Sequence, residues 1–318
     1  MDGALAATFG REHRKCGDSL NHHGIERADL RLERTTLRKK GELLASFWTL
    51  SGKAQPHTDR EYSTFDFRDR VEAAAKAGFK GIGIWDQDLA HIRETRSLQE
   101  MKQILDNNGM KYLELEFLRD WFLEGERKLK SDFEKEKFFE AADVLKPHHL
   151  KVGDFYKEKY EMPRVIESFA ALCKDAAEHG VTIGFELMPF GMIDNLKDAL
   201  TMVEGAGAKN GGIIFDLWHL SKMRVPNPEI SRVPRKHIVS VEINDGTFTA
   251  PWSLHEDTIN HRRFCGEGEF DVRGFLAALE KTGYSGPIGI EVLSKELRPL
   301  SLQEAVTKAF KTTDAQFS

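Results

Sequence analysis

Cysteine is scarce in this sequence of 318 residues and follows no spacing pattern. The three cysteines, Cys16, Cys173 and Cys265, are scattered and odd in number. This argues against a disulfide framework and against a zinc knuckle. Such cysteines are typical of reduced thiols, so we expect a cytoplasmic protein.

Long apolar runs are also absent. The sequence has no run of about 18 apolar residues, the length that a transmembrane helix needs. Residues 1–40 contain no apolar segment of the signal-peptide type. The net charge of -5 argues against a nucleic-acid backbone as the main partner. We therefore expect neither a membrane nor a nucleic acid as partner.

The sequence patterns of several enzyme classes are missing as well. It contains no Gly-x-x-x-x-Gly-Lys, Gly-x-Ser-x-Gly or His-Glu-x-x-His, so NTPase, serine hydrolase and zinc protease chemistry lack support. No Gly-x-Gly-x-x-Gly follows the first expected strand, which disfavours a doubly wound dinucleotide-binding fold.

Residues 1–40 differ from the rest of the chain. They are rich in Arg, His and Asp and show little apolar periodicity, so we interpret them as an N-terminal arm. Disorder and packing across a neighbouring subunit both remain open for this arm, and the second would accompany a homo-oligomer. Residues 41–318 are expected to form the catalytic domain.

From Glu42 onward, short apolar runs alternate with amphipathic stretches. The runs predict strands at Leu43–Leu50, Gly81–Trp85, Lys111–Phe117, His149–Val152, Val181–Leu187, Gly212–Leu217, Ile238–Ile243 and Pro287–Val292. The amphipathic stretches predict helices at Phe67–Ala77, Leu98–Asn108, Pro163–His179, Asn195–Glu204, Val272–Lys281 and Leu302–Phe310. Eight strands in such an alternation predict a (β/α)8 TIM barrel. The long stretch 245–268 would lie on its catalytic face, where it could cover a substrate.

Four of these apolar runs carry a carboxylate where the strand would end. The acids are Glu186, Asp216, Glu242 and Glu291. In a barrel the ends of these strands share one mouth, and four carboxylates gathered there repel one another unless a cation joins them. Oxygen ligands favour Mn²⁺ or Mg²⁺. The alternative is four unrelated acids that cap helices or pair with Lys and Arg.

Four more side chains are candidates for contacts with a substrate. His219 follows Asp216 by three residues and could bind metal or polarise a substrate oxygen. Arg262 could orient a hydroxyl or phosphate, Trp85 could form an aromatic wall, and Lys151 could enter the mouth as a cation. Each residue also has an ordinary interpretation. His219 could be hydrogen-bonded within its own turn, and Arg262 could form an ion pair on the surface. Trp85 could pack at the barrel rim, and Lys151 could be exposed at a strand edge.

The order of these residues resembles the xylose-isomerase-like sugar isomerase/epimerase superfamily. The resemblance covers roughly residues 42–315, and its most specific segment is Gly266-Glu267-Gly268-Glu269-Phe270-Asp271. It implies a TIM barrel with one divalent metal, held here by Glu186, Asp216, the strand-seven position and Glu291. Many members of the superfamily have His where this sequence has Glu242. Either Glu242 replaces this imidazole, or it turns away and the metal site is weakened. In the first case the all-carboxylate set favours Mn²⁺ or Mg²⁺, with Co²⁺ as a third candidate.

The function that the resemblance implies is isomerisation or epimerisation of a small sugar or cyclitol through an enediolate. Glu186 and Glu291 would exchange the proton alpha to a carbonyl, while His219 polarises a substrate oxygen. A metal-dependent dehydratase or lyase acting on an oxidised sugar, cyclitol or glycoside is the second hypothesis. A non-catalytic sugar-binding or partner subunit is the third.

Overall fold

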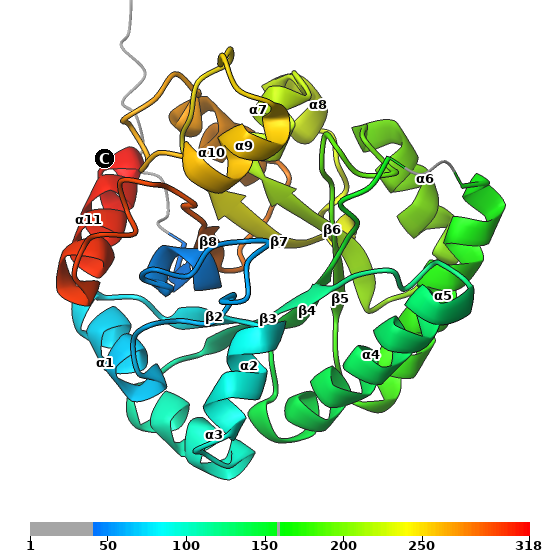
Figure 1. Cartoon of the computed structure of the whole chain (residues 1–318). Coiled ribbons are helices and arrows are strands. Elements are labelled where there is room, and N and C mark those ends of the chain that lie inside the picture. The colour runs from blue at the N-terminus through cyan, green and yellow to red at the C-terminus, as the bar shows by residue number, and fades with distance from the viewer. Residues whose placement is uncertain (1–40, 158–159) are drawn as a thin grey trace, which may run out of the picture. The chain divides into compact units, whose positions relative to one another are not determined.

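The computed structural model describes residues 41–157 and 160–318, so the expected arm at 1–40 lies outside the described residues. Its strands are all parallel and close into a barrel in chain order, as Figure 1 shows. The strands are β1 (Leu43–Ala45), β2 (Gly81–Trp85), β3 (Tyr112–Leu118), β4 (His149–Val152), β5 (Ile183–Glu186), β6 (Gly211–Asp216), β7 (Ile238–Ile243) and β8 (Ile288–Ile290).

Helices surround the strands (Figure 1). They are α1 (Phe67–Ala77), α2 (Asp86–Arg93), α3 (Leu98–Asn107), α4 (Gly125–Leu145), α5 (Met162–Glu178), α6 (Leu196–Ala206), α7 (Leu217–Lys222), α8 (Asn227–Ile230), α9 (Leu254–Asn260), α10 (Val272–Lys281) and α11 (Leu302–Asp314). Short 3-10 helices are η1 (Phe47–Leu50), η2 (Arg235–His237) and η3 (Ala315–Phe317). The predicted TIM barrel is confirmed, and no helix among the described residues has the length and hydropathy to cross a membrane.

The outer helices follow the expected amphipathic pattern. Helix α5 buries Val165, Phe169 and Leu172, whose spacing places them on one helical face. Gly180 follows this helix with a φ of 67°, a left-handed conformation that glycine adopts without steric cost. The helix therefore ends where the sequence predicts, and its apolar face packs into the main core.

The first strand is shorter than the sequence predicts. Residues 43–50 form one apolar run, but only Leu43–Ala45 is a strand, and Phe47–Leu50 turns into η1. Thr49 Oγ1 donates to Ile290 O over 2.6 Å and accepts from Val292 N over 2.9 Å, which anchors the turn to β8. The expected strand ending at Leu50 was wrong, because an apolar run shows burial and not where extended backbone stops.

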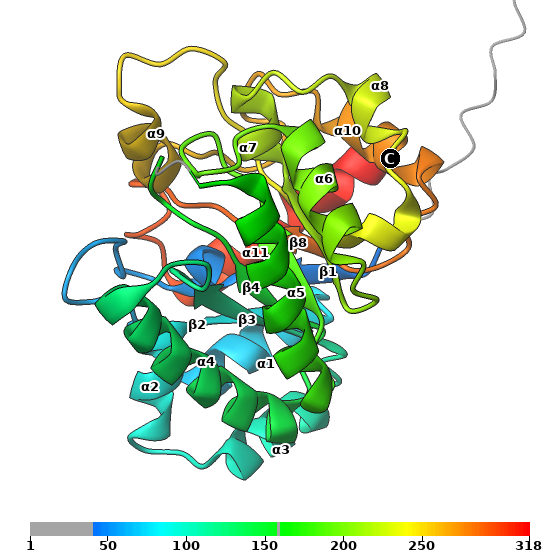
Figure 2. The same ribbon diagram turned by 90° about the vertical axis from the view of Figure 1, so that its right-hand side faces the viewer.

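Segments that follow the strands extend the barrel at one end. The segment after β1 and helix α9, which follows β7, extend beyond the same end of the barrel in Figure 2. A separate apolar cluster lies there, formed by Phe47, Trp48, Ala54, Trp85, Phe117, Met188 and Leu293. The fold thus places an apolar patch beside the strand ends that carry the acids.

Candidate active site

The barrel brings the four strand-end acids together. Glu186 and Asp216 are the last residues of β5 and β6, Glu242 lies in β7, and Glu291 follows β8. Asp216 and Glu242 are register partners on neighbouring strands. Each of the four offers a carboxylate oxygen, and these oxygens all lie within 4.8 Å of one another. This separation is compatible with a single shared cation.

Two further acids enter the barrel from β3. Glu114 and Glu116 are completely buried, and their alternate positions direct both side chains to the same face of the strand. Sequence reasoning missed them because the strand was recognised from Leu113, Leu115 and Phe117. The signal was present in the sequence: charged residues that alternate with apolar ones in a strand buried on both faces point into a polar interior.

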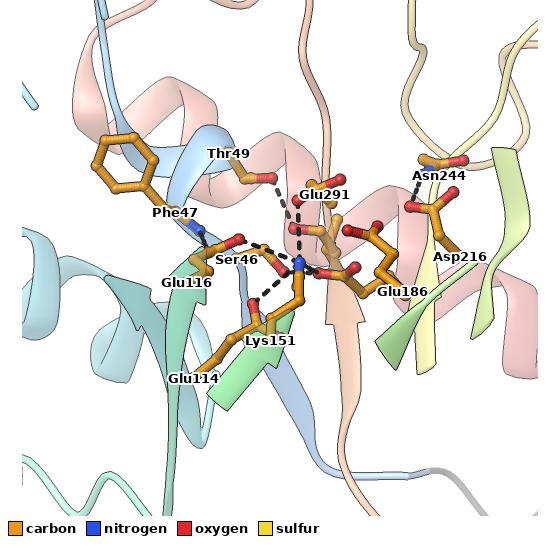
Figure 3. Close-up of polar contacts among 12 residues, drawn as sticks. Ser46, Phe47, Thr49, Glu114, Glu116, Lys151, Glu186, Asp216, Asn244 and Glu291 are labelled. Atoms are coloured by element: carbon orange, nitrogen blue, oxygen red, sulfur yellow. Dashed lines mark hydrogen bonds and ion pairs between the residues drawn. The ribbon is translucent and has the colours of Figure 1, made fainter. Parts of the chain in front are cut away.

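Lys151, on β4, lies among these carboxylates with 1% of its side chain exposed (Figure 3). Its Nζ is 2.7 Å from Glu242 Oε1, 3.1 Å from Glu116 Oε2 and 3.2 Å from Glu291 Oε1. Glu114 Oε1 is 3.6 Å away. The ammonium is thus surrounded by acidic oxygens in the barrel interior.

Arg262 is the second buried cation of the site. Its Nη1 donates to Asp216 Oδ2 over 2.9 Å and to Glu291 Oε2 over 2.7 Å. Its Nη2 donates to Thr258 Oγ1 over 2.8 Å, so the residue is also fixed to the end of α9. The guanidinium therefore couples the loop over the site to two strand-end acids.

His219 lies close to Glu186 and Arg262. Its Nε2 is 3.4 Å from Glu186 Oε1 and 3.3 Å from Arg262 Nη2. Asp216 is the N-cap of α7, and its Oδ1 accepts from the backbone N of His219 over 3.0 Å. The Asp-x-x-His spacing is thus a helix cap that turns the imidazole toward Glu186. Asn244, a residue not singled out in the sequence, donates to Asp216 Oδ2 over 3.1 Å.

Burial and mutual repulsion control the ionisation of the acids. Burial raises the pKa of Glu116, Glu242 and Glu291, and the neighbouring carboxylates raise them further. Burial also acts on Asp216, but Arg262 and His219 outweigh it and lower the pKa of this carboxyl. Burial lowers and four carboxylates raise the pKa of Lys151, and the net shift is upward, so the ammonium stays charged.

The donor set fits a divalent cation. Six buried carboxylates, Glu114, Glu116, Glu186, Asp216, Glu242 and Glu291, face two buried cationic side chains, Lys151 and Arg262. Glu186 Oε1 and Glu242 Oε2 are buried and make no hydrogen bond. Buried acids carry a large desolvation penalty unless a cation or hydrogen bonds compensate them. A dication at these oxygens supplies such compensation.

A cavity of about 60 Å³ opens beside this group. Glu186, Glu291, His219, Arg262 and Trp85 line it, whereas Asp216, Glu242 and Lys151 lie outside its lining. His255, Thr258 and Ile259 contribute as well, which confirms that the stretch 245–268 reaches the site. Lys151 is therefore engaged with carboxylates and has no face on the cavity.

Aromatic rings form part of the cavity wall. Trp85 stacks on Phe117 with ring centroids 5.8 Å apart, Phe117 on Phe155 at 5.0 Å, and Phe155 on Phe190 at 6.4 Å. Arg119 also lines the cavity, and its Nη2 is bound to Asp86 Oδ2 over 2.6 Å. The cavity thus combines an acidic side with an apolar face, which suits a small polar molecule that has one flat side.

The sequence and the fold of this chain are similar to those of known proteins. The family described as "Xylose isomerase-like TIM barrel" matches residues 71–312. A curated relative, the 3-dehydroshikimate dehydratase of Pseudomonas aeruginosa, is 27% identical over 72% of this chain. The match spans only 36% of that relative's own length.

Two further relatives match over most of their length. The inosose isomerase of Bacillus velezensis is 23% identical over 80% of this chain and 92% of its own. A crystal structure of the IOLI protein with a bound zinc atom superposes with a TM-score of 0.76 and 20% identity, covering 87% of this chain and 98% of its own. The curated relatives bear the names of enzymes, an isomerase and a dehydratase.

Proposed function

This chain belongs to the xylose isomerase-like TIM barrel family, and we propose that it is a divalent-metal-dependent isomerase or epimerase of a small keto-sugar or cyclitol. One observation carries the proposal: four carboxylates from consecutive strands converge within 4.8 Å, and two of their buried oxygens have no hydrogen-bond partner. The inosose isomerase relative supports the reaction class, and the acidic site supports the requirement for a cation.

We assign Glu186, Asp216, Glu242 and Glu291 as the residues that hold the metal. Their hard oxygen atoms favour Mn²⁺ or Mg²⁺, with Co²⁺ as a further candidate. When bound, the cation would supply positive charge where negative charge develops on a substrate oxygen. The zinc of the IOLI structure belongs to that protein and leaves the identity of the metal here to experiment.

Glu186 and Glu291 are proposed to move the proton. Both line the cavity, so both can face the carbon next to a substrate carbonyl. One carboxylate removes the proton alpha to the carbonyl, and the other returns a proton at the same or the neighbouring carbon. Burial and nearby acids raise the pKa of Glu291, which suits a group that must carry a proton during part of the cycle.

His219, Arg262 and Trp85 are proposed to hold the substrate. His219 lies 3.4 Å from Glu186 and can polarise a substrate oxygen beside the base. Arg262 faces the cavity while Nη1 is held by two acids and Nη2 by Thr258. The second N–H of Nη2, now 3.3 Å from His219 Nε2, is the group that can turn to a substrate hydroxyl. Trp85 can cover the apolar face of a ring. A small sugar or cyclitol fits these three contacts.

A dehydratase is the second candidate, favoured by the 27% identity to the Pseudomonas aeruginosa enzyme. The reaction would begin with the same proton removal. When a hydroxyl lies beta to the carbanion, the C–O bond breaks, the electron pair forms a C=C bond, and protonation of the leaving oxygen releases water. The balance between the two reactions thus depends on the substrate more than on the acids.

A screen with metal-stripped and reloaded protein tests the proposal. The protein is treated with EDTA, reloaded with Mn²⁺, Mg²⁺ or Co²⁺, and incubated with keto-sugars, inososes and 3-dehydroshikimate. We expect turnover only after reloading, with products of unchanged mass. Loss of 18 mass units, the mass of water, would identify the dehydratase instead. A protein that neither retains nor responds to a metal would favour the third hypothesis, a non-catalytic sugar-binding or partner subunit.

The cytoplasmic location and a homo-oligomeric state stay predictions.

A further inference from the structure

Glu242 is held asymmetrically. Its Oε1 accepts two hydrogen bonds, from Lys151 Nζ over 2.7 Å and from Ser46 Oγ over 2.6 Å. Its Oε2 is buried and accepts none. Two donors on one oxygen fix the plane and rotation of a carboxylate, so the second oxygen is presented in a defined direction. An oxygen of Glu242 lies within 4.8 Å of an oxygen of each of the acids Glu186, Asp216 and Glu291, and Oε2 is the Glu242 oxygen that makes no hydrogen bond.

Lys151 is also placed between two groups of acids. Glu114 and Glu116 lie on β3, and Glu242 and Glu291 lie at β7 and β8, all within 3.6 Å of its ammonium. Figure 3 shows the Lys151 nitrogen between the β3 acids and Glu291. A single positive charge in this position offsets repulsion between the β3 acids and the acids that we assign to the metal.

The burial of this lysine distinguishes it from a substrate contact. Its side chain is 1% exposed and does not line the cavity. Arg262, the other cation of the site, contacts Asp216 and Glu291 instead. Among the described residues, the cation that contacts Glu242 is therefore Lys151.

We propose that Lys151 is a positioning residue of the metal centre: it fixes Glu242 through Oε1 so that Oε2 serves as a metal ligand. This inference rests on the proposed function, because it assumes that the four strand-end acids bind a divalent cation. Lys151 Nζ is closer to Glu242 Oε1, at 2.7 Å, than to Glu291 Oε1, at 3.2 Å. We therefore expect most of its effect on metal affinity to disappear when residue 242 no longer carries a carboxylate. A partner that orients a metal ligand commonly changes metal affinity by about 10- to 100-fold.

A double-mutant cycle on the full chain tests this role. Lys151→Met, Glu242→Gln and the charge-conserving Lys151→Met/Glu242→Gln variant are stripped with EDTA and titrated with Mn²⁺ by calorimetry. We expect each single variant to bind Mn²⁺ at least about tenfold more weakly than the wild type. We expect the double variant to bind like Glu242→Gln, within about threefold, because the two residues act as one unit.

Lys222→Met is the matched control. Lys222 is also a buried lysine paired with a carboxylate, at 2.5 Å from Asp257 Oδ2, but it contacts none of the four strand-end acids. It should lower the melting temperature and leave Mn²⁺ affinity unchanged. The melting temperature of every variant is recorded by circular dichroism. If Lys151→Met does not fold, Lys151→Arg takes its place in the cycle. Arginine keeps the positive charge but places its N–H donors at a different distance from Glu242 Oε1.

Two results would overturn the inference. In the first, the Lys151 single variant binds Mn²⁺ as tightly as the wild type, or more tightly. In the second, the loss of Mn²⁺ binding free energy in the double variant equals the sum of the losses in the two single variants, which would mean that Lys151 acts independently of Glu242. Failure of the proposed metal site has a separate signature, because the wild-type protein itself would then bind no Mn²⁺. Failure of the proposed isomerase reaction alone would show in the product masses of the screen and leave Mn²⁺ binding in place.

Discussion

Arg262 Nη1 and Glu291 Oε2 lie 2.7 Å apart, in a hydrogen bond that joins the segment after α9 to the end of β8. The same nitrogen donates to Asp216, so one guanidinium compensates two acids that we assign to the metal. The arginine and a bound cation would therefore compensate the negative charge of the same two carboxylates.

Arg262→Met should make the protein depend on metal for its stability. The arginine side chain is 3% exposed, and removal of one partner of a buried ion pair typically costs about 3–5 kcal/mol. A bound dication restores part of the missing positive charge. Thermal unfolding with EDTA and with saturating Mn²⁺ measures this, and the metal-induced rise in melting temperature should be larger in Arg262→Met than in the wild type. Equal rises would contradict the shared compensation.

Glu186→Gln should remove most of the turnover while the fold stays intact. The substitution keeps the size of the side chain but removes the base, and a well-placed acid-base group contributes typically about 10²–10⁴-fold. Turnover is measured on the substrate found in the screen, with far-UV circular dichroism as the folding check. Glu280→Gln, at an exposed position on α10, is the control and should be fully active. Near-wild-type rates in Glu186→Gln would rule out the scheme with two carboxylates.

Asp86→Asn should change the pH dependence of stability. Burial raises the pKa of Asp86 to about 6, although Arg119 opposes the shift. The folded state therefore holds a proton that the unfolded state has already lost between pH 4 and pH 6, so this carboxyl reduces stability as the pH rises through that window. The difference reaches about 3 kcal/mol at most, from about two pKa units.

Urea unfolding at pH 4.5 and pH 8 checks this expectation. Asp86→Asn should gain stability relative to the wild type as the pH is raised, since the amide cannot ionise. Asp106→Asn removes an acid whose side chain is 56% exposed and serves as the control. If both variants show the same pH dependence, Asp86 is not the group responsible.

The two described cysteines should be unreactive in the native protein. Cys173 is completely buried and Cys265 is 2% exposed, and burial raises the pKa of both thiols to about 12. Thiolate, the reactive form, is therefore negligible at pH 8. In a Cys16→Ser variant, titration with Ellman's reagent should detect no thiol before denaturation and two afterwards. Rapid labelling of the native variant would contradict the observed packing.

The barrel and the residues of β5 to β8 could be predicted because their signals are local. In β5 to β8 each apolar run shows a strand, and an acid lies at its end or within one residue of it. Lys151 is different: the partners of its ammonium lie 35 to 140 residues away, so the sequence shows a strand lysine but not its surroundings. Glu116 illustrates the same limit, because it meets the ammonium of Lys151 only once β3 has paired with β4.

The segment from β1 to η1 shows a second limit of prediction from sequence. Phe47 and Leu50 are as apolar as strand residues, and the turn of η1 depends on Thr49 reaching the backbone of β8. That contact exists only once the last strand has closed against the first. Sequence reasoning therefore identified the buried segment correctly and assigned its backbone conformation wrongly.

The aromatic wall gives the protein an intrinsic optical reporter. The indoles of Trp48 and Trp85 have ring centroids 5.0 Å apart and both line the cavity. A molecule that enters will replace water against these rings, so tryptophan fluorescence should follow occupancy directly. Trp252, with 46% of its surface exposed, is absent from the cavity lining and should add a constant background. Ligands can thus be ranked by titration in a cuvette before any reaction is known.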